Sequence, residues 1–339
     1  MTEMRGEFEE KIVVCLVDVK PGHANKARDL AALVARRIGG RVVEVHARAW
    51  TRPLGRLLQR CWPLGRNFGR FLLEGELPRG SVLLVGSGGN SLWVLAALGH
   101  SFACPSVFVG RRRQLPAEAL TLSVGADPGR VSERELFLPL LGRPLEKKGE
   151  NWRRLAAERG LADDDYTAVL VGGDGGGYQW SDDEAGRLAA ALRQDFAERG
   201  RKVLISTSRR TPLSFEKMLR EVLPVEMLAD ACWWRSGDER RVVKAYLEGA
   251  GLALVGEDSM SMVQEALTGG LPVLAFRGRN ARVEESSLRF LNWAEGEGAL
   301  GRWDLGEEGG LAERVRDLRA IPRERVDEWQ ESFFRQLAL

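Results

Sequence analysis

The sequence predicts an α/β protein of two successive domains, each a doubly wound parallel sheet with helices on both faces. Three observations support this fold class. The chain has 339 residues, more than a single hydrophobic core usually organises. Short apolar, β-branched runs alternate with helical patterns, which is typical of parallel strands buried on both faces. Glycine is enriched, with 39 residues against a usual share of about 7%, and the glycines cluster after the apolar runs.

The first half of the chain shows four such runs and two helical patterns. The expected strands are Lys11–Val17, Arg41–Val45, Ser81–Val85 and Pro105–Val109. The expected helices are Ala24–Arg37, which ends at the stop signal Gly39-Gly40, and Ser91–Leu98. The polar segment Leu141–Asn151 contains glycine and proline and predicts a linker, so we expect domains at residues 1–145 and 146–339.

The pattern then restarts in the second half. The expected strands are Thr167–Val171, Lys202–Ser206, Leu252–Val255 and Leu271–Phe276. A helix follows Ser181, where Ser181 and Glu184 form a capping box, and another spans Met260–Leu267. The tail from Pro322 to Leu339 predicts a terminal helix, for which a return to the first domain stays open.

Composition excludes several classes of protein. No apolar run approaches the roughly 18–20 residues that span a bilayer. The first eleven residues carry four glutamates, and the run Ile12–Val17 stops at Asp18, which is too short and too acidic for a signal peptide. The four cysteines form no CxxC pair and the three histidines are scattered, so we expect no metal site, no disulfide framework and a cytoplasmic location.

Charge is distributed unevenly along the chain. Residues 1–150 hold 23 lysines and arginines against 15 acids, whereas the remainder is net acidic. The densest basic stretch, Arg48–Arg70, interleaves arginines with aromatic and aliphatic residues, which suits a helix on the inner face of an anionic membrane. The residues expected to face that membrane are Arg52, Arg56, Arg60 and Trp62. A packed surface helix with a solvated arginine face explains the stretch equally well, and no zinc-finger or RNP pattern supports nucleic-acid binding.

Every glycine- or serine-rich loop follows the carboxyl end of an expected strand, where ligands usually bind across a cleft between two such domains. A strand, a small-residue loop and a helix start favour a phosphate. The sequence contains no Walker loop. It also lacks the dinucleotide-binding motif GxGxxG, and Gly86-x-Gly88-x-x-Ser91 comes nearest to it. No cofactor is therefore expected, although an NADP enzyme that uses Arg111–Arg113 for a 2′-phosphate stays a weaker alternative.

The segment from Val255 to Val273 is the most informative. Ser259 and Ser261 flank a helix start, where hydroxyls and amides can hold a diphosphate, and Glu265 lies two turns further on, where a carboxylate can bind ribose hydroxyls. Asp258 or Ser259 as a plain N-cap, and Glu265 as a solvated helix position, are the alternatives.

Glu257 and Glu265 are eight residues apart, and Gly-Gly-Leu-Pro-Val follows them. In these features the segment resembles the nucleotide-sugar site of GT-B fold glycosyltransferases. Three strings resemble more closely the mitochondrial-fission ELM family of plants and its bacterial relatives, which is itself GT-B-like: Gly22-His23-Ala24-Asn25, Ser206-Thr207-Ser208-Arg209-Arg210-Thr211-Pro212 and Glu257-Asp258-Ser259-Met260-Ser261-Met262. The resemblance extends from residue 11 to about residue 293. One departure is Lys26, where family members usually carry glutamine.

The resemblance implies a nucleotide-diphosphate-sugar site in which Glu265 holds the ribose, Ser259 to Ser261 hold the diphosphate, and the arginine pair neutralises phosphate charge. The candidate binding residues are Gly22, Gly172, Gly173, Ser206, Ser208, Arg209, Arg210, Glu257, Asp258, Ser259, Met260, Ser261 and Glu265. His23 and Asp18, at the end of the first strand, are the candidate bases for an acceptor hydroxyl.

The leading hypothesis is thus a nucleotide-sugar glycosyltransferase with a membrane-associated acceptor. A non-catalytic binding or interaction protein derived from GT-B, and a sugar-nucleotide epimerase, are the alternatives.

Overall fold

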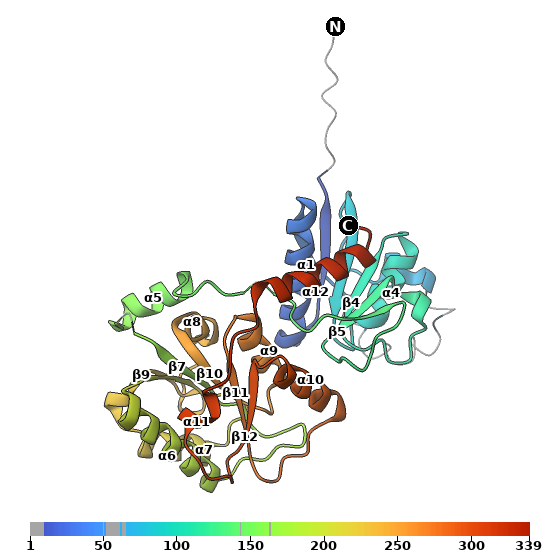
Figure 1. The fold of residues 1–339 in the computed structure, drawn as a ribbon. Helices are drawn as coiled ribbons and strands as arrows, with labels where there is room; N and C mark the ends of the chain where they lie inside the picture. The colour runs from blue at the N-terminus through green and yellow to red at the C-terminus, as the bar shows by residue number, and fades with distance from the viewer. Residues whose placement is uncertain (1–9, 50, 52–61, 63–65, 143, 163) are drawn as a thin grey trace. The chain divides into compact units, whose positions relative to one another are not determined.

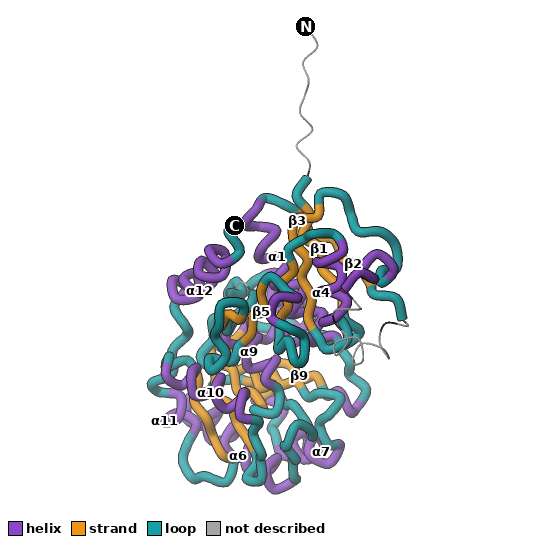
Figure 2. Tube along the Cα trace, turned by 90° about the vertical axis from the view of Figure 1, so that its right-hand side faces the viewer, coloured by secondary structure: helices purple, strands orange, loops and turns teal. Residues whose placement is uncertain are grey.

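The computed structural model describes residues 10–49, 51, 62, 66–142, 144–162 and 164–339. Two compact units form: the first comprises Met1–Arg143 with Asp327–Leu339, and the second comprises Pro144–Val326. In each unit strands alternate with helices along the chain (Figures 1 and 2).

The first unit contains a six-stranded sheet in the order β2-β1-β3-β4-β5-β6, and every pair in it is parallel. Its strands are β1 (Ile12–Val17), β2 (Arg41–His46), β3 (Ser81–Ser87), β4 (Ser106–Val109), β5 (Leu122–Gly125) and β6 (Glu135–Phe137). Its helices are α1 (Pro21–Ile38), α4 (Leu92–Ser101) and the 3-10 helices η1 (Arg66–Phe71) and η2 (Ala117–Ala119).

Alternating residues of β1 enter two different cores. Val13 and Cys15 pack with α1, whereas Val14 and Leu16 pack with α4. Successive side chains of a strand point to opposite faces, so the sheet is covered on both faces, as the continuous apolar runs predicted. The predicted stop after the first helix is confirmed, because Gly39 ends α1 in the left-handed conformation with φ 66°.

The final helix, α12 (Arg323–Gln336), packs on the first unit. Phe333 and Phe334 are buried in the same core as α1. Arg37 of α1 donates two hydrogen bonds to Glu331, the shorter of 2.8 Å, and its guanidinium lies 5.0 Å from the Phe334 ring centroid. The chain therefore returns to its first unit, which was the option that the fold class left open.

The second unit contains a parallel sheet in the order β12-β11-β10-β7-β8-β9. Its strands are β7 (Tyr166–Leu170), β8 (Val203–Ser206), β9 (Leu228–Cys232), β10 (Ala250–Gly256), β11 (Val273–Arg277) and β12 (Leu300–Asp304). Its helices are α5 (Glu150–Arg159), α6 (Asp182–Arg199), α7 (Leu213–Val222), α8 (Val243–Gly249), α9 (Met260–Thr268), α10 (Glu285–Gly296) and α11 (Leu311–Val315), with the 3-10 helices η3 (Val225–Met227) and η4 (Trp234–Ser236).

The start of α6 confirms the capping box. The Glu184 amide donates to Ser181 Oγ over 3.4 Å, and Glu184 Oε2 accepts from the Ser181 amide over 2.8 Å. Both contacts satisfy amides that a helix N-terminus would otherwise leave unpaired.

No helix among the described residues is both long and apolar enough to cross a membrane.

Candidate functional site

Three loops meet at the carboxyl edge of the second sheet. Strands β10, β7 and β8 are neighbours and parallel, so the loops that follow them leave the sheet side by side. These loops carry Gly172 and Gly173 after β7, Ser208 to Thr211 after β8, and Glu257 to Ser259 after β10. Most of the candidate binding residues are thereby brought to one edge of the second unit.

Asp258 connects the three loops. Its side chain is fully buried, and its Oδ2 accepts hydrogen bonds from the Gly173 amide and from Arg210 Nη2, each over 2.8 Å. Burial raises the pKa of this carboxyl to about 6, against the lowering effect of the Gly173 amide and of Arg210. The carboxylate therefore holds Arg210 in place and compensates part of its charge.

The two glycines after β7 are required by this packing. A Cβ at Gly172 would overlap the Asp258 carboxylate, and one at Gly173 would overlap the backbone of Arg210 and Thr211. Any side chain at either position would separate the loops. The Gly-Gly pair, interpreted from the sequence as part of a phosphate cradle, thus also allows the close approach of the loop after β8.

Hydroxyl groups fix the loop after β8. Ser208 Oγ donates to the Gly172 carbonyl over 2.7 Å, and the Ser208 amide donates to Thr211 Oγ1 over 2.8 Å. Arg210 Nη1 donates to the carbonyls of Gly173 and Asp174 over 3.1 and 3.2 Å. Ser206 is buried inside β8, whereas Arg209 is exposed. Both arginines are exposed, and Arg210 is held by these contacts and by its hydrogen bond to Asp258.

Helix α9 begins at the same edge. Ser259 occupies the N-cap position without making a side-chain capping bond, and its Oγ lies 3.4 Å from Ser261 Oγ. The first amides of a helix have no partner within the helix, and here they belong to Met260, Ser261 and Met262. Two hydroxyls and the positive end of the helix dipole are the groups that bind an anion.

The two glutamates of the Glu-x7-Glu spacing have different environments. Glu257 is fully buried; its oxygens accept from Arg302 Nε over 2.8 Å, from Arg302 Nη2 over 3.1 Å and from the Tyr178 hydroxyl over 3.0 Å. Burial, followed by Glu257, raises the pKa of the Tyr178 hydroxyl. Glu265, in the second turn of α9, is exposed. Of the two, Glu265 is therefore the one that a ligand can reach.

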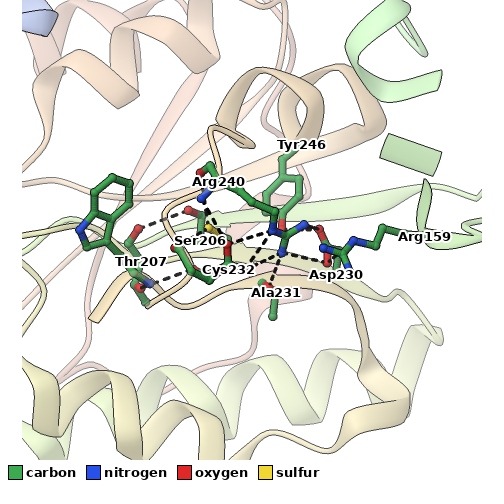
Figure 3. Close-up of polar contacts among 10 residues, drawn as sticks. Arg159, Ser206, Thr207, Asp230, Ala231, Cys232, Arg240 and Tyr246 are labelled. Atoms are coloured by element: carbon green, nitrogen blue, oxygen red, sulfur yellow. Dashed lines mark hydrogen bonds and ion pairs between the residues drawn. The ribbon is translucent and has the colours of Figure 1, made fainter. Parts of the chain in front are cut away.

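The loop after the edge strand β9 is pinned by a separate polar network (Figure 3). Asp230 Oδ2 accepts from Arg240 Nη1 over 2.9 Å and from the Tyr246 hydroxyl over 2.8 Å. Arg240 also donates to the Ala231 carbonyl over 2.8 Å and to Asp238. The same loop is also bonded to the residue that follows β8: Thr207 Oγ1 accepts a hydrogen bond from the Trp234 amide over 2.8 Å. These contacts hold the loop beside the end of β8.

In the first unit, Asp18 and His23 both lie beside Gly88. A Cβ at Gly88 would overlap Asp18 Oδ2 and lie 3.0 Å from His23 Cδ2. Burial lowers the pKa of His23; Asp18 raises it, and Lys26, Lys20 and Arg113 lower it further. The lowered pKa favours the neutral imidazole, which is the form that can accept a proton. Gly22 is exposed at the start of α1.

The residues expected to face a membrane are only partly described. Trp62 is 7% exposed and belongs to the core that contains α4. Arg52, Arg56 and Arg60 lie outside the described residues.

Sequence reasoning missed Arg302 and Tyr178, and it considered Arg113 only as part of the run that could meet a 2′-phosphate. Arg302 lies on β12. The sequence did not predict this strand, because Arg302 and Asp304 interrupt its apolar residues. Arg113 has a φ of 52° and packs its guanidinium over Gly89, where a Cβ would lie 3.0 Å from Cζ. The Arg111–Arg113 run was its only signal. No group of three or more metal-ligating side chains occurs among the described residues.

Solved structures share this architecture over nearly their whole length. UDP-GlcNAc 2-epimerase from Methanocaldococcus jannaschii is 12% identical with a TM-score of 0.58, over 97% of this chain and 99% of that one. E. coli ADP-heptose LPS heptosyltransferase II is 16% identical with a TM-score of 0.50, over 97% and 100%. Acinetobacter baumannii MurG is 13% identical with a TM-score of 0.50, over 94% and 93%. At such identities the likeness defines the fold alone, and the fold is GT-B-like.

A comparison of the sequence with known families gives a more specific assignment than the fold does. The family described as Mitochondrial fission ELM1 matches residues 140–316, slightly more than half of the chain. The protein belongs to this family, and the two strings that begin at Ser206 and Glu257 lie within the matched residues. No curated protein matches it.

Proposed function

We propose that the second unit binds the diphosphate of a nucleotide sugar at the start of α9, and that the protein transfers the sugar to an acceptor. One observation carries the proposal: the uncapped N-terminus of α9, with the hydroxyls of Ser259 and Ser261 3.4 Å apart, begins at the edge where Asp258 holds Arg210. Helix N-termini with small polar side chains bind phosphates well. Two of the structurally similar proteins, the ADP-heptose heptosyltransferase and the UDP-GlcNAc 2-epimerase, are named for nucleotide sugars, which supports the same ligand class.

The proposed roles follow from which side chains are exposed and which are already held by buried groups. Arg209 is exposed and free of the buried carboxylate that holds Arg210, so it is the better candidate for direct contact with phosphate. Glu265, exposed on α9, is the candidate for the ribose hydroxyls. Glu257 supports the loop from within, through Arg302.

Two arginine substitutions test the binding step. Arg209→Ala removes an exposed charge at the edge, and Arg193→Ala removes a charge that is also exposed, from the helix α6. Loss of a charge-assisted hydrogen bond costs about 1.5–3 kcal/mol, so calorimetry should show at least about 10-fold weaker binding of the preferred nucleoside diphosphate to the first variant. Equal affinities for both variants would contradict the assignment.

His23 and Asp18 are the proposed bases for the acceptor. If the protein is a transferase, His23→Gln should abolish release of the nucleoside diphosphate from a bound sugar nucleotide and leave its affinity unchanged. NMR of the donor in D₂O separates the alternatives: exchange at a sugar carbon would identify an epimerase, and an unchanged, bound donor would identify a non-catalytic binding protein.

We also propose that the first unit touches an anionic membrane. Phe68 and Phe71 on η1 are 54% and 65% exposed, and Arg70 lies 5.8 Å from the ring centroid of exposed Phe102. Exposed aromatics beside arginines suit a lipid interface. Replacing Phe68 and Phe71 together by serine should reduce cosedimentation with phosphatidylglycerol vesicles, whereas undiminished binding would contradict the proposal.

A further inference from the structure

Three exposed arginines lie around η4, the short helix that follows β9 in the second unit. Arg235 Nη1 donates to the Arg209 carbonyl over 3.4 Å, and Arg220 Nη1, from α7, donates to Ser236 Oγ over 2.6 Å. Arg235 and Ser236 are neighbours in η4, so these two contacts connect all three arginines. Arg209, Arg220 and Arg235 are termed the η4 cluster, and each of them is exposed.

The positive charge of the η4 cluster is not matched by ion pairs. Within the part of the chain that the structure describes, none of its three arginines makes an ion pair, and the hydrogen bonds of Arg220 and Arg235 go to an uncharged hydroxyl and an uncharged carbonyl. The second half of the sequence is net acidic, so this concentration of cations is a local feature. Cations held close together repel one another, and a bound anion relieves that repulsion.

A fully buried carboxylate fixes η4 in place. Glu216, on α7, accepts from Ser236 Oγ over 2.6 Å and from the Arg235 amide over 2.9 Å. It also accepts from Thr207 Oγ1, which in turn accepts from the Trp234 amide over 2.8 Å. A buried charge is costly without such hydrogen bonds, and these bonds tie the backbone of η4 to α7 and to the end of β8. Arg235 is therefore presented from a fixed backbone, which reduces the entropy lost when it binds a ligand.

The η4 cluster continues the edge that carries the candidate phosphate site. Strands β8 and β9 are adjacent and parallel, so Arg209 after β8 and Arg235 after β9 leave the sheet at the same edge. Arg210, in the same loop as Arg209, reaches the other way and donates to Asp258 beside the start of α9. Guanidinium groups therefore extend along this edge from the start of α9 toward η4.

The number and type of the charges select a phosphate as the ligand. A guanidinium group presents N–H donors in a fork that matches two oxygens of one phosphate. The three arginines and the buried Glu216 carboxylate leave an excess of two positive charges. A phosphate group carries about two negative charges at neutral pH, whereas a carboxylate carries one and leaves part of the repulsion in place.

We propose that the η4 cluster is a phosphate-binding subsite, in which Arg235 and Arg220 join Arg209 in holding phosphate oxygens. This assigns a binding role to the segment after β9, which the candidate site has not included so far. The inference rests on the proposed function only for the further step that this phosphate belongs to a nucleotide sugar. Binding of an inorganic phosphate or pyrophosphate requires no nucleoside.

Arginine footprinting of the full-length protein locates the anion directly. Phenylglyoxal modifies accessible guanidinium groups, and mass spectrometry of the digested protein gives the rate at each arginine. Pyrophosphate at about ten times its dissociation constant should slow modification of Arg235 and Arg220 about 10-fold. Arg241, an exposed arginine in the same loop, should keep its rate. Sodium chloride at the same ionic strength is the control for screening.

A matched pair of variants tests the same residues by affinity. Arg235→Gln and Arg241→Gln each remove one exposed positive charge from the loop after β9, and neither opens a cavity. Calorimetry should show pyrophosphate binding to Arg235→Gln at least about 10-fold more weakly than to the parent. Arg241→Gln should bind it as the parent does.

Three results would overturn the inference: unchanged modification of Arg235 with pyrophosphate, equal protection of Arg241, or equal affinities of the two variants. Protection of Arg235 by phosphatidylglycerol vesicles but not by pyrophosphate would overturn the choice of a soluble phosphate. If pyrophosphate protects Arg235 and no nucleoside diphosphate binds more tightly than pyrophosphate, the proposed function fails and the subsite stands. If nucleotide binding depends on Arg209 and not on Arg235, the subsite fails and the proposed function stands.

Discussion

Asp258 is a fully buried acid in the second unit whose pKa is raised by burial from 3.8 to about 6. Between these two values the folded state binds more protons than the unfolded state, so this group makes the free energy of unfolding fall as pH rises from about 4 to about 6. Asp258→Asn cannot titrate. Urea unfolding at intervals across this range should show the variant losing less stability with rising pH than the parent; parallel curves would show that the Asp258 pKa is not raised.

Gly173 illustrates a residue whose importance lies in what it lacks. A Cβ there would overlap backbone atoms of Arg210 and Thr211, which cannot move away as a flexible side chain can. Gly173→Ala should lower the free energy of unfolding by roughly 1–3 kcal/mol and weaken nucleotide binding, because the loop after β8 must shift.

Gly186, inside α6 with open space around its Cβ position, is the matched control. Gly186→Ala should raise stability by about 0.5–1 kcal/mol and leave binding unchanged. Equal effects of both substitutions in thermal unfolding would mean that the loops are not closely packed.

At the scale of elements, α12 is the last helix of the chain, and it packs into the core of the first unit. Phe333 is fully buried with α1 and the sheet, whereas Leu339 is 41% exposed. Phe333→Ala should cost about 3–5 kcal/mol, and Leu339→Ala should cost little. A small cost for both in urea unfolding would show that α12 does not complete this core.

Sequence patterns predicted most central strands and the edge strand β2, and they missed β5, β6, β9 and β12. The buried strands β1, β3, β4, β7, β8, β10 and β11 are continuous apolar runs, and each was expected within two residues at either end. The edge strand β9 contains Asp230 and the edge strand β12 contains Arg302, so neither reads as an apolar run. Strands β5 and β6 have four and three residues, too few to show a period.

The same limit explains what the sequence could indicate about the site. Loops after predicted strands could be placed at a carboxyl edge, because parallel strands share it. The partners of individual charged side chains could not be predicted. Glu257 pairs with Arg302 and Asp258 pairs with Arg210, and each pair is separated by more than forty residues in the sequence. Such pairings depend on strand order, which periodicity does not contain.

At the scale of the whole molecule, the two units differ in charge and in the chemistry of their loops. Residues 1–150 carry the basic excess, whereas the net acidic remainder carries the hydroxyl-rich start of α9 and the arginine pair. This contrast is the basis on which we propose that the diphosphate binds in the second unit.

Titration calorimetry of the full-length protein with UDP, GDP, CDP, ADP and NADP tests the central claim most directly. A single nucleoside diphosphate should bind with a saturable heat, and the same ligand should raise the unfolding temperature, because a ligand at about 100 times its dissociation constant adds about 2.7 kcal/mol of stability. Selective binding of one nucleoside diphosphate would establish the anion site at α9 and name the donor's base. Binding of NADP alone, or of no nucleotide, would contradict a nucleotide-sugar site in the second unit.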